Sequence, residues 1–119
     1  MKKDLILVGS GGHCKSVIDV AESAGYNIIG ILGRPEELDK KILMHYVIGN
    51  DNDIPQYVND AEFVISVGQI KSNFVRRKIA DLIEQAGGKL ATIVAADAYV
   101  SKYATIGKGT VIMHKAFVN

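Results

Sequence analysis

Apolar runs and helix-like patterns alternate along the first three quarters of the chain. The run Leu5-Ile6-Leu7-Val8 is continuous and is followed by glycines, which is typical of a strand buried on both faces of a sheet. From residue 15 to residue 24 the apolar positions then recur at helical spacing, and Gly25 follows them as a natural helix end. The chain therefore opens with a predicted strand and a predicted helix.

The same alternation continues downstream. Further strands are predicted over 28–32, 61–67 and 90–94, a short helix from the caps at 51–53 to about 58, and a longer helix over 73–86. Residues 36–44 show no clear period and stay unassigned, and a short apolar stretch follows at 46–48. Strands that alternate with helices over short connections predict an α/β fold, with a Rossmann-like parallel sheet and helices on both faces.

The period changes after Val94. Aliphatic residues then stand six apart, each preceded two positions earlier by a small residue, and these pairs are Ala98 and Val100, Ala104 and Ile106, Thr110 and Ile112, and Ala116 and Val118. Hexapeptide repeats build a parallel β-helix whose coils must stack on neighbours before they bury a core. We therefore predict two domains, a Rossmann-like domain over 1–94 and the first coil of a left-handed β-helix over 95–119. The second is expected to continue in a longer protein, and a short natural chain capped by oligomerisation is the alternative.

Composition narrows the classes of partner. A formal net charge of +1 provides no long-range field for nucleic acid or an acidic membrane, so a small-molecule ligand is expected. The first apolar run is too short for a signal peptide or a membrane span, and the single cysteine fits a reducing compartment. A cytoplasmic protein is predicted. The three histidines show no metal-ligand spacing, so no metal site is expected.

The glycine-rich stretch after the first strand is the leading candidate site. Its sequence is VGSGGHCK over residues 8–15, and free amides at a helix start at the carboxyl edge of a parallel sheet favour an anion. Gly9 and Gly11 fit the dinucleotide fingerprint, but Cys14 occupies its third glycine position and Gly33-Arg34 stands where an acid would hold the ribose. NAD is thus disfavoured, and Arg34 as a 2′-phosphate partner leaves an NADP-type site open.

The neighbours of this loop suggest further contacts. His13 has an imidazole suited to donate to a sugar or phosphate oxygen or to act as a base, and a plain capping role is the equal alternative. Cys14 cannot face His13 because adjacent helical residues point about 100° apart, so a small packing residue is expected, and His114 is expected to be an exposed coil histidine. The candidate substrate-binding residues are Gly9, Ser10, Gly11, Gly12, His13, Arg34, Gly68, Gln69 and Lys71.

Four motifs in order resemble one family over the whole chain. They are VGSGGHCKSVIDV, the strand IIGIL, SVGQIK followed by Arg76, and the terminal ATIGKGTVIMHKAFVN. Together they are similar to the N-terminal part of the sialic acid O-acetyltransferase and sugar O-acyltransferase (NeuD/PglD-like) family, which includes N-acetyltransferases acting on UDP-4-amino-sugars. The resemblance implies a Rossmann-like domain that binds the sugar or nucleotide-sugar acceptor. It also implies a left-handed β-helix that forms a homotrimer and binds acetyl-CoA between subunits.

The chain departs from the family pattern at several points. Cys14 stands where many members have glycine, Gly33-Arg34 where many have an acidic pair, and Ala95-Ala96-Asp97 where His-Pro is common. The family's catalytic histidine lies in a later coil and His114 does not match it, so this fragment is expected to bind the acceptor, to carry no catalytic residue and to transfer no acetyl group. Two alternatives remain open, an NADP-dependent oxidoreductase fragment and a non-enzymatic module that senses a sugar nucleotide.

Overall fold

A mostly parallel five-stranded sheet forms the centre of the protein. The computed structural model describes residues 3–67 and 73–119. The sheet has the order β3-β4-β2-β1-β5, with β3 antiparallel to β4 and the other pairs parallel. Its strands are β1 (Asp4–Val8), β2 (Asn27–Leu32), β3 (Lys41–Ile42), β4 (His45–Gly49) and β5 (Glu62–Ile65). The predicted α/β fold with a parallel sheet is confirmed.

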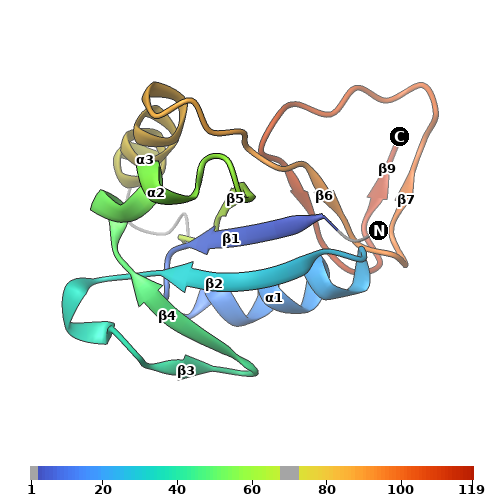
Figure 1. Ribbon diagram of the computed structural model, residues 1–119. Coiled ribbons are helices and arrows are strands. Elements are labelled where there is room, and N and C mark those ends of the chain that lie inside the picture. Colours follow the sequence, from blue (N-terminus) through green and yellow to red (C-terminus); the bar gives the residue numbers. More distant parts are fainter. Residues whose placement is uncertain (1–2, 68–72) are drawn as a thin grey trace.

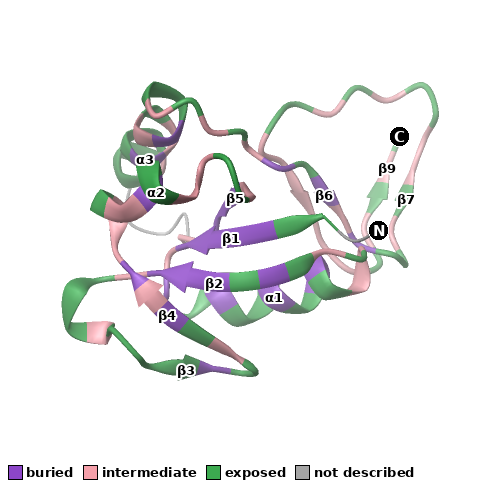
Figure 2. Cartoon of the chain, viewed as in Figure 1, coloured by how far each residue is buried: buried purple, intermediate pink, exposed green. Residues whose placement is uncertain are grey.

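Helices cover both faces of this sheet, as Figure 1 shows. The described helices are α1 (His13–Ser23), α2 (Ile54–Tyr57) and α3 (Asn73–Gln85), with 3-10 turns η1 (Pro35–Glu37) and η2 (Asp51–Asp53). Leu5 and Leu7 of β1 pack in the core beneath α1, whereas Ile6 and Val8 pack in the core beneath α2 and α3. This alternation explains why the β1 run is uninterruptedly apolar, and Figure 2 shows most of that strand buried.

The part of the chain after residue 35 that the sequence pattern leaves unassigned contains the strands β3 and β4. Residues 41–49 form the β3–β4 hairpin, and β4 joins the sheet by pairing Val47 with Ile31 of β2. Leu43 in the hairpin turn has a φ of 54°, a left-handed conformation that leucine rarely adopts. No glycine or asparagine in this turn indicates it from the sequence. The sequence pattern does not predict these two strands because both are too short to show a clear period.

The predicted strand over 90–94 is wrong in its extent. Only the beginning of this stretch stays on the sheet, where Leu90 forms a bridge with Phe63 of β5 and the Ala91 amide donates to the Phe63 carbonyl at 2.7 Å. From Ile93 the chain leaves the sheet, and β6 (Ile93–Val94) pairs in parallel with β8 (Val111–Ile112). The stretch has a strand-like pattern because Ala91, Ile93 and Ala95, which are spaced two apart, are all buried against the α1 side of the core.

The C-terminal segment folds into two short parallel ladders beside α1. Besides the β6–β8 pair, β7 (Tyr99–Val100) pairs with β9 (Phe117–Val118). The register joins Ile93 to Val111 and Tyr99 to Phe117, so both ladders connect positions 18 residues apart, the difference between 111 and 93 and between 117 and 99. The rings of Tyr99 and Phe117 stack with centroids 4.9 Å apart. Residues 18 positions apart therefore lie side by side in both ladders of the C-terminal segment.

Candidate functional site

The candidate site lies where the chain changes direction across the sheet. β1 lies between β2 and β5; it leads into α1 on one face, while β5 is followed by α3 on the other. In open α/β sheets a crevice opens at this switch point, outside the carboxyl ends of the strands. The glycine loop after β1 therefore borders a natural binding crevice.

Gly9 fixes the start of this loop. Its amide donates to the Leu32 carbonyl at 2.8 Å, and its carbonyl accepts from the Ser66 hydroxyl at 2.7 Å, so the residue is fastened to strands on both sides. Its φ is 129°, and a side chain there would meet the backbone of Ser66 and Val67 at 2.9 Å. Only glycine suits this position.

A cavity of about 470 Å³ opens in front of the loop, within the size range of small-molecule sites. Its walls combine an apolar part with polar and charged groups from the ends of β2 and β4. The lining residues are Gly9, Ser10, Gly11, Leu32, Gly33, Arg34, Pro35, Glu37, Asn50, Asp51, Asn52, Val67, Val75 and Ile79.

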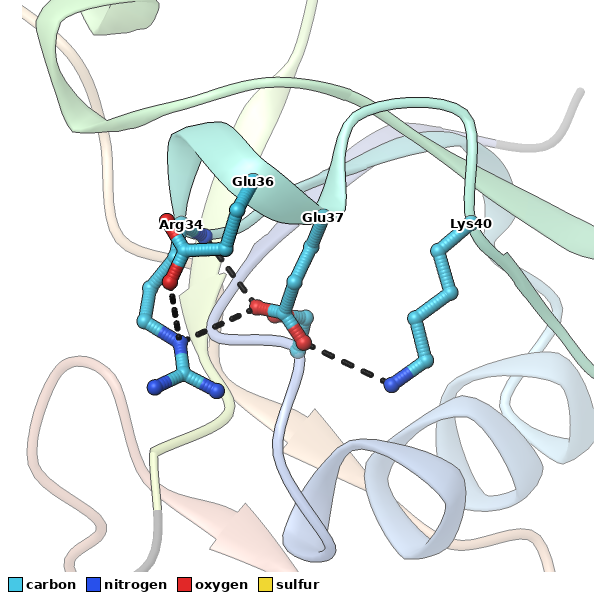
Figure 3. Close-up of polar contacts among 5 residues, drawn as sticks. Arg34, Glu36, Glu37 and Lys40 are labelled. Carbon is cyan, nitrogen blue, oxygen red and sulfur yellow. Dashed lines mark hydrogen bonds and ion pairs between the residues drawn. The ribbon is translucent and has the colours of Figure 1, made fainter.

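Glu37 is the hub of the polar wall. Its carboxylate accepts hydrogen bonds from the Ser10 hydroxyl, from the backbone amide of Arg34 at 3.3 Å and from Arg34 Nε at 3.4 Å. Lys40 Nζ donates to its other oxygen at 3.4 Å, and Figure 3 shows Arg34 and Lys40 converging on it from two sides. The side chain is only 12% exposed. A single carboxylate thus ties the η1 turn to the glycine loop.

These contacts change the acidity of Glu37. The Ser10 hydrogen bond, helped by those from Arg34 and Lys40, lowers the pKa of Glu37 from 4.5 to about 2. A carboxylate with a depressed pKa stabilises the fold above its unfolded pKa, near 4.5, and this contribution disappears as the pH falls towards 2.

The substitution Glu37→Gln tests this network. At pH 7 we expect the variant to be less stable by about 1.5–3 kcal/mol, the usual worth of hydrogen bonds to a charged group. The gap between wild type and variant should shrink as the pH falls from 5 to 2. Urea unfolding of both proteins at several pH values measures it, and a gap that does not vary with pH would contradict the assignment.

A second cavity, of about 560 Å³, lies between the sheet and the C-terminal segment. Its basic lining residues are His13 at the start of α1, Arg76 of α3 and Lys108, and Arg76 is held in place by donating to the Val67 carbonyl at 2.9 Å. The described lining includes no acidic residue; its other members are Ile65, Gly109, Thr110, Val111 and Met113. This cavity therefore suits an anionic or hydroxyl-rich group.

The structure distributes the predicted site residues over both cavities. Gly9, Ser10, Gly11 and Arg34 line the first cavity, His13 lines the second, and Gly12 caps α1 between them. The hydroxyl of Ser10 is already engaged by Glu37. The predicted residues Gly68, Gln69 and Lys71 lie outside the described residues.

Sequence reasoning missed Glu37 and the Asn50-Asp51-Asn52 group. Glu37 follows the end of β2 by a Pro-initiated turn, which brings the acid back towards the loop. The Asn50 side chain accepts from the Asn52 amide at 2.9 Å and so shapes the second polar turn, and burial raises the pKa of Asp51 beside it. The sequence contains both polar turns, as PEE over 35–37 and NDND over 50–53. The sequence pattern leaves the first unassigned, and it indicates helix capping for the second.

Two other expectations have clear outcomes. Cys14 is completely buried in the core under α1, and burial raises its pKa to about 11, so it is the packing residue that was predicted and not a nucleophile. His114 is half-buried rather than an exposed coil residue, because Asp97 and Asp19 hold its ring from two sides.

Residues 3–67 and 73–119 lack a clustered set of metal ligands and a long apolar helix. No group of three histidine, cysteine or acidic side chains gathers there to hold a metal ion. Within the same residues, no helix has the length and apolar character that crossing a bilayer requires.

Two solved acetyltransferase structures have a similar architecture. A mutant of perosamine N-acetyltransferase from Caulobacter crescentus, in complex with CoA and GDP-perosamine, matches with a TM-score of 0.85 and 23% identity over 97% of this chain and 53% of its own. The acetyltransferase domain of PglB from Neisseria gonorrhoeae, in complex with acetyl coenzyme A, matches with a TM-score of 0.82 and 28% identity over 98% of this chain and 56% of its own. The chain thus spans about half the length of these structures.

A more distant likeness concerns the fold alone. The protein RSP in complex with β-NADH matches with a TM-score of 0.57 and 15% identity over 99% of this chain and 54% of its own. A comparison with curated protein sequences gives no significant match.

The family assignment comes from the sequence itself. The family model described as the PglD N-terminal domain matches residues 4–83. This range includes the five-stranded sheet, α1, α2, both polar turns and all of α3 except its last two residues. This range contains the glycine loop, Arg34 and Glu37. The chain therefore belongs to the PglD N-terminal domain family, as the NeuD/PglD-like resemblance predicted.

Proposed function

We propose that this domain binds the sugar or nucleotide-sugar acceptor of an acetyl-CoA-dependent sugar acetyltransferase of the kind that serves bacterial cell-surface glycan synthesis. The observation that carries the proposal is the cavity at the switch point, where the glycine loop faces Arg34 and Glu37. The perosamine enzyme that shares the fold was solved with a nucleotide-sugar, GDP-perosamine.

The chemistry of the first cavity suits a nucleoside. Its apolar wall from Leu32, Val75 and Ile79 offers a surface for a base, while the Glu37 carboxylate can accept hydrogen bonds from ribose hydroxyls. The exposed loop residues Gly11 and Gly12 place backbone amides at the start of α1, where a phosphate is favoured. Arg34, whose side chain is 76% exposed, adds a positive charge at the rim.

The second cavity suits the sugar and its anionic groups. It lies on the other side of the first turn of α1 and faces the C-terminal segment. His13 borders it together with Arg76 and Lys108, so an imidazole and two cations surround the space. We assign His13 a hydrogen bond to the sugar or to its phosphate, and no role in acetyl transfer. Gly68, Gln69 and Lys71 remain predicted contacts at the same edge.

The C-terminal ladders support the proposed first coil, and β6 (Ile93–Val94), which precedes the proposed boundary, already pairs within it. Parallel pairing of positions 18 residues apart corresponds to three hexads per turn, and the two stacked rings, Tyr99 and Phe117, are separated by the same interval. We propose residues 1–94 as the acceptor domain and 95–119 as the first coil of a left-handed β-helix. In the whole enzyme that β-helix would assemble as a homotrimer and use acetyl-CoA as the acetyl donor. No residue of this chain is assigned a contact with acetyl-CoA, and a cytoplasmic location stays a prediction.

Calorimetric titration of the chain tests the proposal. UDP-, GDP- and CMP-linked sugars, free sialic acid and NADPH are the ligands to compare. We expect at least one sugar ligand to bind, and Arg34→Ala to weaken it about tenfold, since losing a charged hydrogen bond removes roughly 1.4 kcal/mol or more. Arg77→Ala is the matched control, because Arg77 is exposed on α3 and lines neither of these cavities.

The titration also separates the alternative functions. Tight binding of NADPH with no response to any sugar ligand would favour an oxidoreductase fragment and contradict the proposal. Acetyl transfer by the whole protein would instead exclude a purely non-enzymatic sensing module.

A further inference from the structure

A histidine bridges two carboxylates where the C-terminal segment meets α1. His114 Nδ1 lies 2.9 Å from Asp97 Oδ1, in the turn after β6, and His114 Nε2 lies 3.0 Å from Asp19 Oδ2 on α1. Asp97 Oδ1 also accepts from the Lys115 amide at 3.0 Å. Three separate stretches of chain therefore meet at one imidazole.

The two contacts differ in kind. The Asp97 contact is a hydrogen bond that fixes the proton on Nδ1. The Asp19 contact is close, but it is not aligned as a hydrogen bond, and Nε2 is shielded from solvent. The atom therefore has a negative charge beside it and no aligned hydrogen-bond partner among the described groups, which makes its protonation state decisive.

The protonation state of the His114 ring decides whether both contacts are attractive. A neutral imidazole has one N–H, and Asp97 takes it, so Nε2 would then direct a lone pair at the Asp19 carboxylate. A doubly protonated imidazole presents N–H groups to both carboxylates and neutralises part of their repulsion. The arrangement is thus attractive on both sides only when the ring is charged.

We propose that protonated His114 fastens α1 to the C-terminal segment through Asp19 and Asp97, and that loss of the Nε2 proton releases the Asp19 arm. Because α1 begins at the glycine loop, this clamp sets how the loop and the C-terminal segment are held on either side of the second cavity. It rests on the contacts alone and stands whether or not the proposed acceptor binds.

The electrostatics agree with this geometry. The hydrogen bond to Asp97, with the charges of Asp97 and Asp19, raises the pKa of His114 above 6.5, although partial burial opposes the shift. A raised pKa means that the clamp is complete below about 6.5, the pKa of histidine in the unfolded chain, and is lost as the pH rises through the folded value.

Other polar contacts hold the same junction without a histidine or a carboxylate. The Ala96 amide donates to the Ser23 hydroxyl at 3.3 Å, and the Tyr26 hydroxyl donates to the Thr92 carbonyl at 3.3 Å. Release of His114 therefore loosens the junction and does not detach it. We therefore expect release of His114 to change local hydrogen exchange more than global unfolding.

Hydrogen exchange and NMR titration of the full 119-residue chain test the clamp. We expect the His114 ring to titrate above 6.5 in the wild type and at lower pH in Asp19→Asn. Protection of the Ala96 amide, corrected for intrinsic exchange, should fall about two- to five-fold between pH 6 and pH 8, the range expected for a partly exposed ion pair. This fall should vanish in Asp19→Asn, whose substituted side chain is 72% exposed and tolerates the change.

Glu22→Gln is the matched control on the same helix. Glu22 pairs with His45 at 3.0 Å on the β4 side, so this variant should leave both the His114 titration and the pH-dependent protection unchanged. The clamp is overturned if Asp19→Asn leaves the His114 titration unmoved, or if protection at Ala96 is the same across the titration.

Discussion

Gly9→Ala should be the most damaging single methyl addition in the glycine loop, and we expect it to lower stability by about 3 kcal/mol. Forcing an L-residue out of its preferred region contributes roughly 1–2 kcal/mol, and the φ of Gly9 is 129°. The new Cβ would also meet the Ser66 carbonyl carbon and the Val67 nitrogen at 2.9 Å. Overpacking against backbone adds about 1–3 kcal/mol because no side chain can rotate away.

Thermal unfolding measures this effect. A loss of about 3 kcal/mol corresponds to a fall in Tm of roughly 10 °C for a chain of this size. Gly11→Ala and Gly12→Ala are the controls, since a Cβ at either position meets nothing within 4 Å in the described residues. These two should stay within about 0.5 kcal/mol of wild type. Equal losses at all three positions would mean that the Gly9 geometry is not the cause.

Gly33→Ala should lower stability by about 2 kcal/mol through a different mechanism. The φ of Gly33 lies outside the left-handed region, so alanine is tolerated by the backbone, but its Cβ would collide with the Ser10 hydroxyl and approach Ser10 Cβ to 2.9 Å. Ser10 would have to turn away from Glu37. The Glu37 carboxylate then loses its strongest hydrogen bond, a loss of about 1.5–3 kcal/mol.

A double-mutant cycle with Ser10→Gly isolates this mechanism. Without the Ser10 side chain, Gly33→Ala has nothing to collide with, so it should cost much less in that background than in the wild type. Denaturant unfolding of the four proteins gives the coupling, which we expect to be about 1–2 kcal/mol. Additive losses would show that the methyl group added at Gly33 acts elsewhere than on Ser10.

The parts of the fold that the sequence predicted well are those that bury a continuous apolar surface. β1, α1 and β2 carry dense apolar patterns with glycine stops, and the observed bounds differ from the predicted ones by one or two residues. β4 went unassigned because its pairing depends on Val47 meeting Ile31. Such a contact between distant strands leaves no period in a five-residue strand.

The candidate site was predictable only in its first half. The glycine loop and Arg34 follow from the rule that parallel strands end at one edge. Glu37 was not predicted as a site residue because its position depends on a 3-10 turn that folds back on Ser10. His114 escaped for a similar reason, since its partner Asp19 lies on α1, far away in the sequence.

Burial of Cys14 has a practical consequence for following motion in this protein. It is the single cysteine in the sequence, it has no exposed surface, and its thiol ionises only near pH 11. Thiolates, and not thiols, attack maleimide and methanethiosulfonate reagents, so the native residue should not be labelled at neutral pH. Spectroscopic probes attached to cysteines engineered on α1 and on β9 would then report the distance between these two elements, with no signal from a labelled Cys14.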